Sequence, residues 1–508
     1  MGLVLVWSRF ANLGTSFWSD EAYSAYYYSN RGPHGIWFGT YVPNNHVLYN
    51  LLSWVTQAGI GRFEASYRIW SVVPGAAAVV LCAWWVWKRF GPIAATALVV
   101  LATVSPVHLV LTPQARGYGL AMFAGVVMLV GAARASDSGE TRDVVLFAIG
   151  AVIGIWTLPV FAVAAIGQSF VLLWNKTIRK RTFIACIVIA ALAILCYAPL
   201  FGGILDNADQ QFGTRLAVVE TVTGVYHHLA APTLSNAMPF ALHSTFNEVA
   251  TFFVFALLTI SAITRLWRRG DRVLLANLLV PIFFTYLVLV VGRFYVQPRF
   301  ASYLLFHVLV VLAIGVQQLW EVIARVTALK AVAAVVIVAF ALTGSARVAS
   351  LTEAQAKLPW ENGKFVAQVA KATGMNYVFT DSTHPGALYF YMGADHVVAM
   401  HATAVQKRSF CAVQSRFIFV DDEYHQIVTP HLKCLTDRHA LKIKVPQQLD
   451  PPIRRPGAVT MYIVPATRKF QAKQKAKAKR RAAAQRQPAA KKKPAEKKQP
   501  TTSTTQPG

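Results

Sequence analysis

Long apolar runs separated by short polar stretches dominate the chain between residues 66 and 343. A helix that crosses the hydrocarbon core of a bilayer needs about 20 predominantly apolar residues. The runs therefore predict membrane helices at Ser66–Trp87, Pro92–Leu109, Tyr118–Ala133, Val144–Trp156, Pro159–Trp174, Thr182–Leu200, Val249–Trp267, Val273–Val291, Phe300–Trp320 and Ala328–Thr343. With a partial helix at the N-terminus, we expect an all-α polytopic membrane domain of about 11 transmembrane helices over residues 1–349.

The N-terminal run, Gly2–Val6, is too short to span a bilayer. We expect either that the protein begins upstream of Met1 or that its first helix is truncated. The run is not a signal peptide, because it lacks a basic n-region and a small-residue cleavage site. Residues 14–65 are predicted to form the first external loop. Within that loop, His46–Gly59 has the amphipathic pattern of a helix that lies in the membrane interface.

The pattern changes after residue 350, where short β-rich runs alternate with one helical segment. The strands are expected at Tyr377–Thr380, His396–Met400, Arg416–Val420 and Val459–Val464, and the helix at Glu361–Thr373. Residues 350–466 are therefore predicted to form a small α/β domain. Residues 467–508 are rich in Lys, Ala, Gln and Pro, which predicts a disordered basic tail.

Composition supports the membrane class and excludes nucleic-acid binding. The 508-residue chain is 55% hydrophobic and only 14% charged, too little charged surface for a soluble protein of this size. Its net charge of +27 is unevenly placed, because about half of the excess lies in the basic tail. Much of the remainder lies in short loops between apolar runs, where basic residues orient membrane helices.

Loop charge predicts the orientation of the membrane domain. Alternate loops are basic, and the positive-inside rule makes them cytoplasmic: Lys88/Arg89, Arg134/Arg142, Lys176/Arg179/Lys180/Arg181, Arg265/Arg268/Arg269/Arg272 and Arg325/Lys330. The opposite loops, which include the first external loop, are then extracytoplasmic. After an odd number of spans, the α/β domain is expected on that same side.

Polar clusters on the external side supply candidate chemistry. The adjacent acids Asp20 and Glu21 follow Ser19, so one interpretation is an ordinary helix start in which Ser19 is the N-cap and the acids complement the helix dipole. The functional interpretation is that Asp20 accepts a proton from an acceptor hydroxyl as a general base. Two carboxylates with His46 can also hold a divalent cation.

Two arginines of the external clusters, Arg116 and Arg299, are candidates for binding a phosphate, because the guanidinium fork matches phosphate oxygens and stays charged beside lipid. Taken singly, each arginine can also extend toward lipid head groups without a catalytic role. His46 alone is more often a packed histidine than a ligand. The surrounding Tyr and Trp residues fit an interfacial aromatic belt as well as a sugar platform. The remaining polar members of the external clusters are Asn45, Gln114, Tyr118 and Tyr303.

The cysteines give no specific chemistry. Cys82, Cys186 and Cys196 fall in apolar runs and are expected to be packing residues. Cys411 and Cys434 lie in the predicted α/β domain, where a disulfide and two separate thiols are both open.

Several strings of the chain resemble one known family. SFWSDEAYS, PNNHVLYNLL, EASYRIWSVVPG, SPVHLVLTPQARGYGL and QPRFASYLLF are similar to the polyprenyl-phosphate-sugar-dependent glycosyltransferases of the GT-C fold. The resemblance includes protein O-mannosyltransferases, lipid A aminoarabinose transferases and, most closely, rhizobial lipopolysaccharide-core galacturonosyltransferases. It covers about residues 13–131 well and 298–306 moderately.

The resemblance implies roles for individual residues. Asp20 and Glu21 correspond to the acidic active-site signature, and His46, Arg116 and Tyr118 to further pocket positions. Arg299 corresponds to a contact with the lipid phosphate of the donor. The family commonly has Pro-Pro after the histidine, where this chain has Val47-Leu48. It also commonly has Glu at the position of Gln114, and this difference removes one metal ligand.

The sequence therefore predicts a hexosyl- or pentosyltransferase of the bacterial cytoplasmic (inner) membrane, with its active site outside, and the resemblance implies that transfer inverts the sugar carbon. The donor is a polyprenyl-phosphate sugar and the acceptor is an envelope glycan, lipid or protein. A transporter or flippase for a lipid-linked sugar would also need many spans and arginines, but with charges near the membrane midplane rather than at helix ends. A third alternative is a non-catalytic scaffold whose basic tail binds anionic polymer. The sugar, the acceptor, the need for a metal and the oligomeric state are not predicted.

Overall fold

The protein is represented by a computed structural model that describes residues 1–39, 45–204, 226–237, 244–292, 298–357, 363–375, 378–380, 386–392, 397–399, 417–422, 439–444 and 459–486. The chain forms two compact units. The first holds residues 1–369, 384–397 and 445–459, and the second holds 370–383, 398–444 and 460–508. These units do not follow the predicted boundary at residue 350, because residues 350–369 and 384–397 cluster with the helices. Cys411 and Cys434 lie outside the described residues.

All the apolar runs predicted to cross the membrane form helices in the first unit. They are α5 (Glu64–Phe90), α6 (Pro92–Val104), α7 (Pro106–Leu111), α8 (Tyr118–Ser138), α9 (Thr141–Thr157), α10 (Phe161–Trp174), α11 (Arg179–Tyr197), α15 (Ser244–Arg268), α16 (Arg272–Gly292), α17 (Leu305–Ile323) and α18 (Thr327–Lys357). Among the described residues, seven helices are long and apolar enough to span a bilayer: α5, α8, α11, α15, α16, α17 and α18. The first unit is that of a multi-pass membrane protein, as expected.

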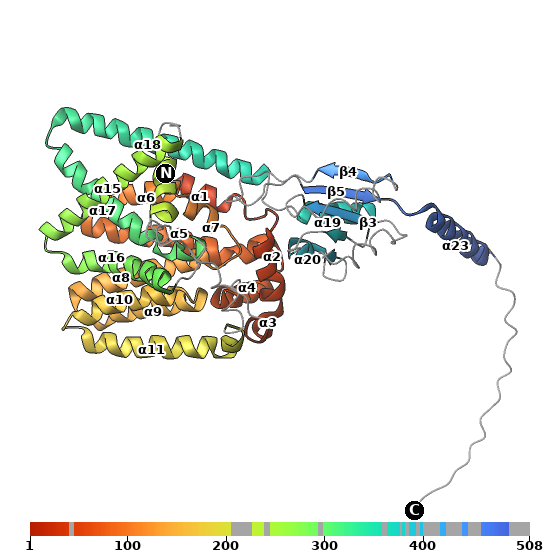
Figure 1. Cartoon of the computed structure of the whole chain (residues 1–508), viewed down its shortest axis with the longest axis horizontal. Helices are drawn as coiled ribbons and strands as arrows, with labels where there is room; N and C mark the ends of the chain where they lie inside the picture. Colours follow the sequence, from red (N-terminus) through yellow and green to blue (C-terminus); the bar gives the residue numbers. More distant parts are fainter. Residues whose placement is uncertain are drawn as a thin grey trace, which may run out of the picture. The chain divides into compact units, whose positions relative to one another are not determined.

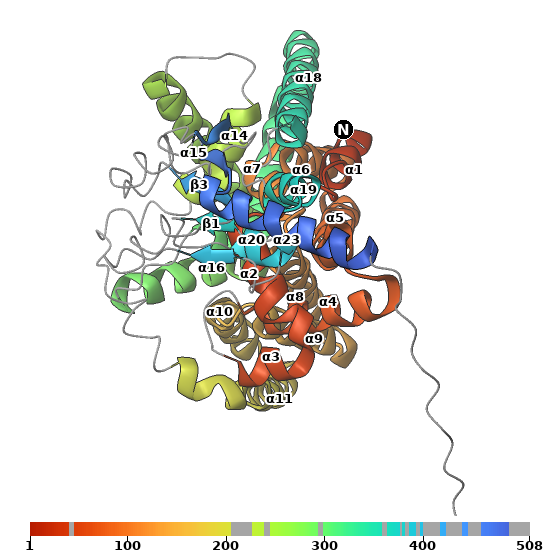
Figure 2. The ribbon, with the colours of Figure 1, turned by 90° about the vertical axis from the view of Figure 1, so that its right-hand side faces the viewer.

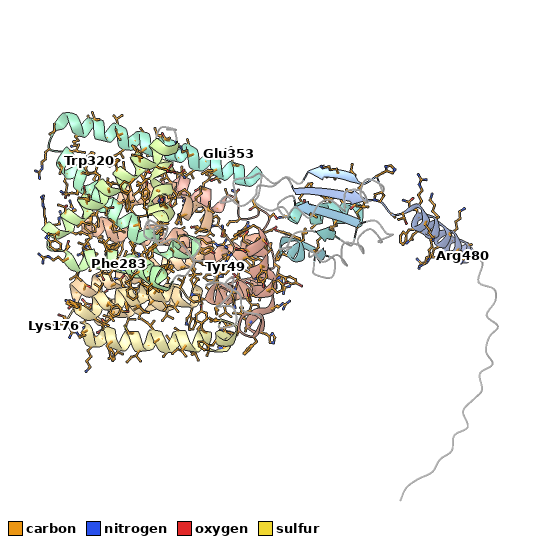
Figure 3. The ribbon with its side chains drawn as sticks, in the orientation of Figure 1. Tyr49, Lys176, Phe283, Trp320, Glu353 and Arg480 are labelled. Carbon is orange, nitrogen blue, oxygen red and sulfur yellow. The ribbon has the colours of Figure 1, made fainter. Side chains whose placement is uncertain are left out.

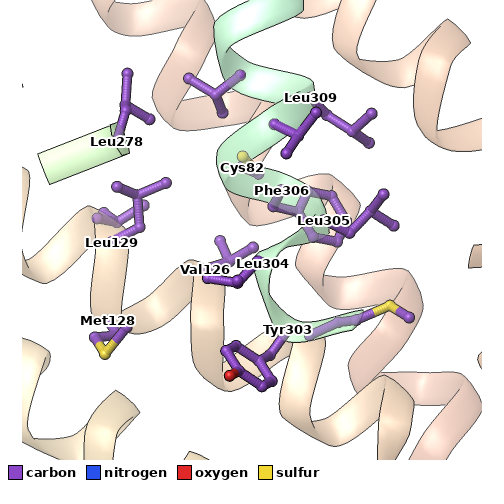
Figure 4. Packing of buried hydrophobic residues seen from close by; sticks show 14 of the residues in the cluster. Cys82, Val126, Met128, Leu129, Leu278, Tyr303, Leu304, Leu305, Phe306 and Leu309 are labelled. Atoms are coloured by element: carbon purple, nitrogen blue, oxygen red, sulfur yellow. The ribbon is translucent and has the colours of Figure 1, made fainter. Parts of the chain in front are cut away.

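Two helices form the centre of this unit. The apolar windows of α8 and α17 are 83% and 89% buried, whereas those of α11 and α18 are 22% and 12% buried. The outer helices therefore present their apolar side chains to the surroundings, as membrane helices do. Figure 4 shows the packing at the centre, where Leu304 lies beside Val126 of α8.

One predicted helix, Pro92–Leu109, is broken into α6 and α7. Pro106 lacks an N–H group and disfavours helical backbone at the residue before it, and Ser105 is extended with ψ 116°. The break leaves carbonyls at the end of α6 without helical partners. Arg9 of α1 (Gly2–Phe10) is fully buried and donates from Nη2 to the carbonyls of Ala102 and Thr103, at 3.0 Å each.

The short helices of the first loop gather at one end of the bundle. They are α2 (Ser19–Tyr27), η1 (Ser29–Arg31), α3 (Gly32–Phe38) and α4 (Val47–Ile60). The residue that caps α2 is Trp18, so the prediction that Ser19 is the N-cap is wrong by one position. Figures 1 and 2 show α2, α3 and α4 at the same end of the bundle. Lys176, in the basic loop between α10 and α11, lies at the opposite end in Figure 3.

Other basic loops meet at the end that carries Lys176. Arg89, in the last turn of α5, pairs with Asp137 of α8 and lies 3.4 Å from Asp271, between α15 and α16. Arg181 donates to the carbonyl of Gly139 in the loop between α8 and α9. The loops that the positive-inside rule groups together are therefore neighbours in the fold. The side of the membrane they face stays a prediction.

The second unit is a small α/β body, as expected. Its five-stranded sheet has the order β2-β1-β3-β5-β4, with β1 (Val378–Thr380), β2 (Val397–Ala399), β3 (Phe417–Asp422), β4 (Leu441–Lys444) and β5 (Val459–Val464). β1 pairs with β3 in parallel, and β4 pairs with β5 antiparallel. Helix α19 (Gly363–Thr373) matches the predicted helical segment. Strand β4 was not predicted, and neither was helix α20 (Gly386–Met392), which belongs to the first unit.

The first part of the predicted disordered tail is helical. Residues Arg468–Arg486 form α23, and residues 487–508 lie outside the described part of the chain. The segment consists almost entirely of Lys, Arg, Ala and Gln, which have high helix propensity, and it has no Gly or Pro. The prediction of disorder rested on low hydrophobicity, and it is wrong for this segment because the helix propensity of its residues favours a helix.

Candidate active site

Glu21 is a buried carboxylate whose oxygens are fully engaged. Arg68 donates to it from Nε to Oε1 at 3.0 Å and from Nη2 to Oε2 at 2.7 Å. The backbone N–H groups of Trp18 and Ala115 donate to the same carboxylate, the first at 3.2 Å. The side chain is only 2% exposed. Four donors occupy the two oxygens, so Glu21 joins the start of α2, helix α5 and the turn before α8.

Arg68 also holds the chain that leads into α2. Its Nη1 group donates to the carbonyls of Leu13 and Thr15, both at 2.9 Å, and its Nη2 group donates to the carbonyl of Ser16 at 3.3 Å. The side chain is buried one turn inside the N-terminal end of α5. We did not single out Arg68 from the sequence, although an arginine inside an apolar run is a signal of function by default.

Asp20 lies next to Glu21 but has a different environment. Its Oδ2 atom pairs with Arg116 Nη1 and lies 3.0 Å from Arg299 Nη2. Arg116 is completely buried, whereas the side chains of Asp20 and Arg299 are each 22% exposed. Two guanidinium groups from distant parts of the chain therefore converge on one carboxylate that still reaches solvent. The structure brings these three predicted residues together.

Close backbone packing places the two arginines. Arg299 lies in η4 (Pro298–Leu304), which rests against α8. A Cβ added at Gly125 of α8 would lie 2.5 Å from the carbonyl oxygen of Tyr303, so only glycine permits this approach. Arg116 precedes Gly117, where an added Cβ would lie 2.4 Å from Thr157 and 2.9 Å from His46 Nδ1. Any larger residue at Gly125 or Gly117 would prevent these close approaches.

His46 contacts both the Arg116 side chain and the backbone of Gly117. Its Nδ1 atom accepts a hydrogen bond from the N–H of Gly117 at 2.8 Å, so the neutral ring carries its proton on Nε2. That Nε2 atom lies 3.2 Å from Arg116 Nη2, which is also a donor. Burial, and then the charges of Arg116 and Arg299, lower the pKa of His46 well below 6.5, so the ring is neutral at physiological pH.

Further buried polar atoms lie on the same residues. Within the part of the chain that the structure describes, Tyr118 Oη and Arg299 Nε are buried and have no hydrogen-bond partner. The Tyr118 ring lies under the Arg116 guanidinium at 5.2 Å and edge-on to His46 at 5.2 Å. Buried donors without protein partners are costly, which makes these two groups candidates for contacts with a bound ligand.

Other predicted site residues serve different contacts. Asn45 donates to the carbonyl of Ile36 at 2.7 Å and accepts from Asn50 at 3.1 Å, which braces the first loop. Tyr303 donates to the carbonyl of Val160 at 3.3 Å and packs its ring on Phe161, within the apolar core (Figure 4). Gln114, two residues before Arg116 in the sequence, is buried, and its Oε1 atom has no partner among the described residues.

The three candidate metal ligands are not arranged to hold a cation. Asp20 faces two guanidinium groups, and both oxygens of Glu21 accept from four donors. Both ring nitrogens of His46 lie against donors. In the described residues no group of three or more His, Cys, Asp or Glu side chains is placed to bind a metal. The donor set therefore fits an anion better than a cation.

The neutral, buried His46 predicts a pH dependence of stability. Its pKa is lower in the folded protein than in the unfolded chain, so below about pH 6.5 the unfolded state takes up the proton first and gains stability. Each pH unit in that window is expected to cost the wild type about 1.4 kcal/mol relative to His46→Gln. Thermal unfolding in detergent between pH 7.5 and 5 measures the difference. The same substitution at the exposed His34 is the control, and equal pH profiles for wild type and His46→Gln would contradict the prediction.

Comparisons with known proteins identify the fold. No protein-family model and no curated protein sequence matches the chain. The crystal structure of ArnT from Cupriavidus metallidurans in the apo state matches with 12% sequence identity and a TM-score of 0.52, over 90% of this chain and 95% of that one. The structure of the same protein bound to undecaprenyl phosphate matches with 12% identity and a TM-score of 0.55, over 91% and 96%. The chain therefore has the membrane fold of ArnT, which is the GT-C fold that its sequence resemblance implies.

Proposed function

We propose that the chain is a membrane glycosyltransferase that moves a sugar from a polyprenyl-phosphate donor to a hydroxyl of an envelope glycan, lipid or protein. It would act at the outer face of the bacterial cytoplasmic membrane. The observation that carries the proposal is the convergence of Arg116 and Arg299 on the partly exposed Asp20. That ArnT has been solved with undecaprenyl phosphate supports a donor of this lipid class.

The two arginines suit the phosphate of such a donor. Guanidinium groups bind phosphate oxygens through paired, charge-assisted hydrogen bonds. Tyr118 Oη and Arg299 Nε, both buried and without partners in the described residues, add donors beside them. The Nε2–H of neutral His46 faces the same region as Arg116 Nη2, and an anionic oxygen accepts from both. These groups would stabilise the charge that develops as the phosphate leaves.

Asp20 suits the role of general base. In the proposed reaction the acceptor oxygen bonds to the anomeric carbon, the bond from that carbon to the phosphate oxygen breaks, and Asp20 accepts the acceptor proton. Attack from the face opposite the phosphate inverts the configuration at the sugar carbon. Glu21 would position the start of α2 and take no part in proton transfer, because its oxygens already accept hydrogen bonds from Arg68. No step uses a metal, because the carboxylates and His46 do not form a ligand set.

The deciding experiment follows the label of a polyprenyl-phosphate sugar in membranes that contain the protein. Transfer of labelled sugar to an envelope acceptor, with and without a chelator, supports the proposal. Movement of intact labelled lipid across the membrane without product would instead support a flippase. If neither occurs while the protein is folded, the proposed function is wrong.

Arg299→Gln is expected to weaken binding of polyprenyl phosphate by about 10-fold or more, because a charge-assisted pair contributes about 1.5–3 kcal/mol. Affinity is measured by titrating the purified protein in detergent. The control is Arg142→Gln, which removes a guanidinium that forms an exposed pair with Glu140. Equal affinity of Arg299→Gln and wild type would remove this arginine from the phosphate site.

A further inference from the structure

The turn that leads into the Asp20–Glu21 helix is held from a second side by residues far along the chain. Arg68 holds this turn, residues 12–18, from helix α5. The second set of contacts comes from α20 and from the start of α19. Residues 384–397 belong to the same compact unit as the membrane helices, and α20 packs against α2.

The hydroxyl of Tyr391, in α20, bridges this turn and helix α5. Its hydroxyl accepts from the N–H of Phe17 at 2.9 Å and donates to Glu64 Oε1 at 3.1 Å. Burial, together with the charge of Glu64, raises the pKa of Tyr391, so the hydroxyl keeps the proton that it donates. Phe17 lies three residues before Asp20, and its N–H precedes the first turn of α2.

The neighbouring ring contacts fix the same point. Phe17 is fully buried, and its ring lies edge-on to Phe390 at 4.7 Å and to Tyr67 at 5.3 Å. The Arg68 guanidinium lies 5.1 Å from the Phe17 ring centre. Phe17 is therefore enclosed by α5 on one side and α20 on the other. Such an enclosure leaves little freedom for the backbone that follows.

Lys364 adds an ionic contact near the start of α19. Its Nζ atom lies 2.7 Å from Glu64 Oε1 and donates to the carbonyl of Gly14 at 3.2 Å. Its backbone N–H donates to Ser16 Oγ at 3.4 Å. Glu64 thus accepts from both Tyr391 and Lys364, and it begins α5, four residues before Arg68. The Glu64 carboxylate therefore joins α20 and the start of α19 to α5, the helix whose Arg68 binds Glu21.

We propose that Tyr391, with the Glu64–Lys364 pair, is a positioning residue for Asp20, so that a segment following the last membrane helix completes the active site. The inference rests on the proposed glycosyltransferase function. Tyr391 acts through Phe17, which sets where α2 starts and hence where the Asp20 carboxylate lies. A shift of about 1 Å in a catalytic group costs up to about 10²-fold in rate. The donor phosphate contacts, Arg116 and Arg299, come from other elements and keep their places.

The test is Tyr391→Phe, which keeps the ring packing and removes only the hydroxyl. We expect kcat for sugar transfer to fall about 10-fold while KM for the polyprenyl-phosphate sugar changes less than 2-fold. Amide exchange of the peptide covering residues 12–18, measured by mass spectrometry on the full chain in detergent, should become faster at Phe17. Tyr226→Phe is the matched control, because it also removes a hydroxyl that is hydrogen-bonded to the backbone, here to the carbonyl of Glu248.

A double-mutant cycle separates positioning from general loss of stability. Tyr391→Phe and Glu64→Gln should cost less together than the sum of their separate costs in kcat, because both act on one contact. Wild-type kcat and unchanged exchange in Tyr391→Phe would overturn the proposal. Equal losses in kcat and donor affinity, matched by Tyr226→Phe, would also overturn it. If the wild type transfers no sugar, the proposed function fails, and the exchange at Phe17 still decides whether Tyr391 holds the turn.

Discussion

Asp20→Asn is expected to reduce sugar transfer by about 10²-fold or more, because the amide cannot accept the acceptor proton. The same variant should bind polyprenyl phosphate at least as tightly as the wild type. In the structure the Asp20 carboxylate occupies Arg116 and Arg299, so it competes with a phosphate for the same two guanidinium groups. Removal of its charge ends that competition. Single-turnover transfer and titration with polyprenyl phosphate measure the two effects separately.

Asp137→Asn is the matched control for this prediction. Asp137 also pairs with an arginine, Arg89, but it lies among the basic loops at the other end of the bundle. Its replacement should change neither transfer nor lipid affinity. Full transfer activity in Asp20→Asn would remove the general-base assignment. Weaker lipid binding in that variant would show instead that Asp20 holds the arginines in place for the phosphate.

Arg68→Gln is expected to cost about 3–5 kcal/mol of unfolding free energy, because it leaves the buried Glu21 carboxylate without its main charge partner. Sugar transfer should be lost with it, because Arg68 also anchors the turn before α2. The double variant Glu21→Gln/Arg68→Gln should be more stable than Arg68→Gln alone, since no unpaired buried charge remains. Chemical unfolding in mixed micelles measures the free energies of the wild type, Glu21→Gln, Arg68→Gln and the double variant.

The comparison for this effect is Arg142→Gln. Arg142 pairs with Glu140, and both side chains are exposed, 69% and 49%. Exposed pairs contribute about 0–1 kcal/mol, so this variant should remain close to the wild type. Additive losses from Glu21→Gln and Arg68→Gln, with no recovery in the double variant, would show that the two side chains do not act as a pair.

Membrane helices were the most predictable part of the fold, because a bilayer demands length and apolarity and both are visible in sequence. Every predicted span is helical in the structure, and the break at Ser105 is a local effect of Pro106. Strand β4 was missed because Leu441–Lys444 is short and has only two apolar residues, which alternate with two lysines. The helix of the basic tail was missed because composition was weighed above helix propensity.

Sequence singled out the three residues that meet at Asp20, but it did not predict their contacts; their roles stay predictions. Asp20, Arg116 and Arg299 were recognised from their residue types and motifs, and the structure joins them. The sequence does not reveal that the adjacent Glu21 faces Arg68 and that its oxygens are fully hydrogen-bonded. Asp20 and Glu21 carry the same functional group, so residue type alone does not separate their roles. Tyr391 lies in a segment without a motif, so only tertiary contact reveals it.

The order in which these residues leave the ribosome bears on the biosynthesis of the protein. Asp20 emerges early, but Arg299 follows only after most of the membrane helices, and Tyr391 later still. Until those segments arrive, the carboxylate lacks one of its two cations and the turn before it lacks one of its two supports. A nascent chain that stalls before η4 would therefore hold an incomplete pocket, however many helices it has already inserted. Competence for transfer would appear as one of the last events of synthesis.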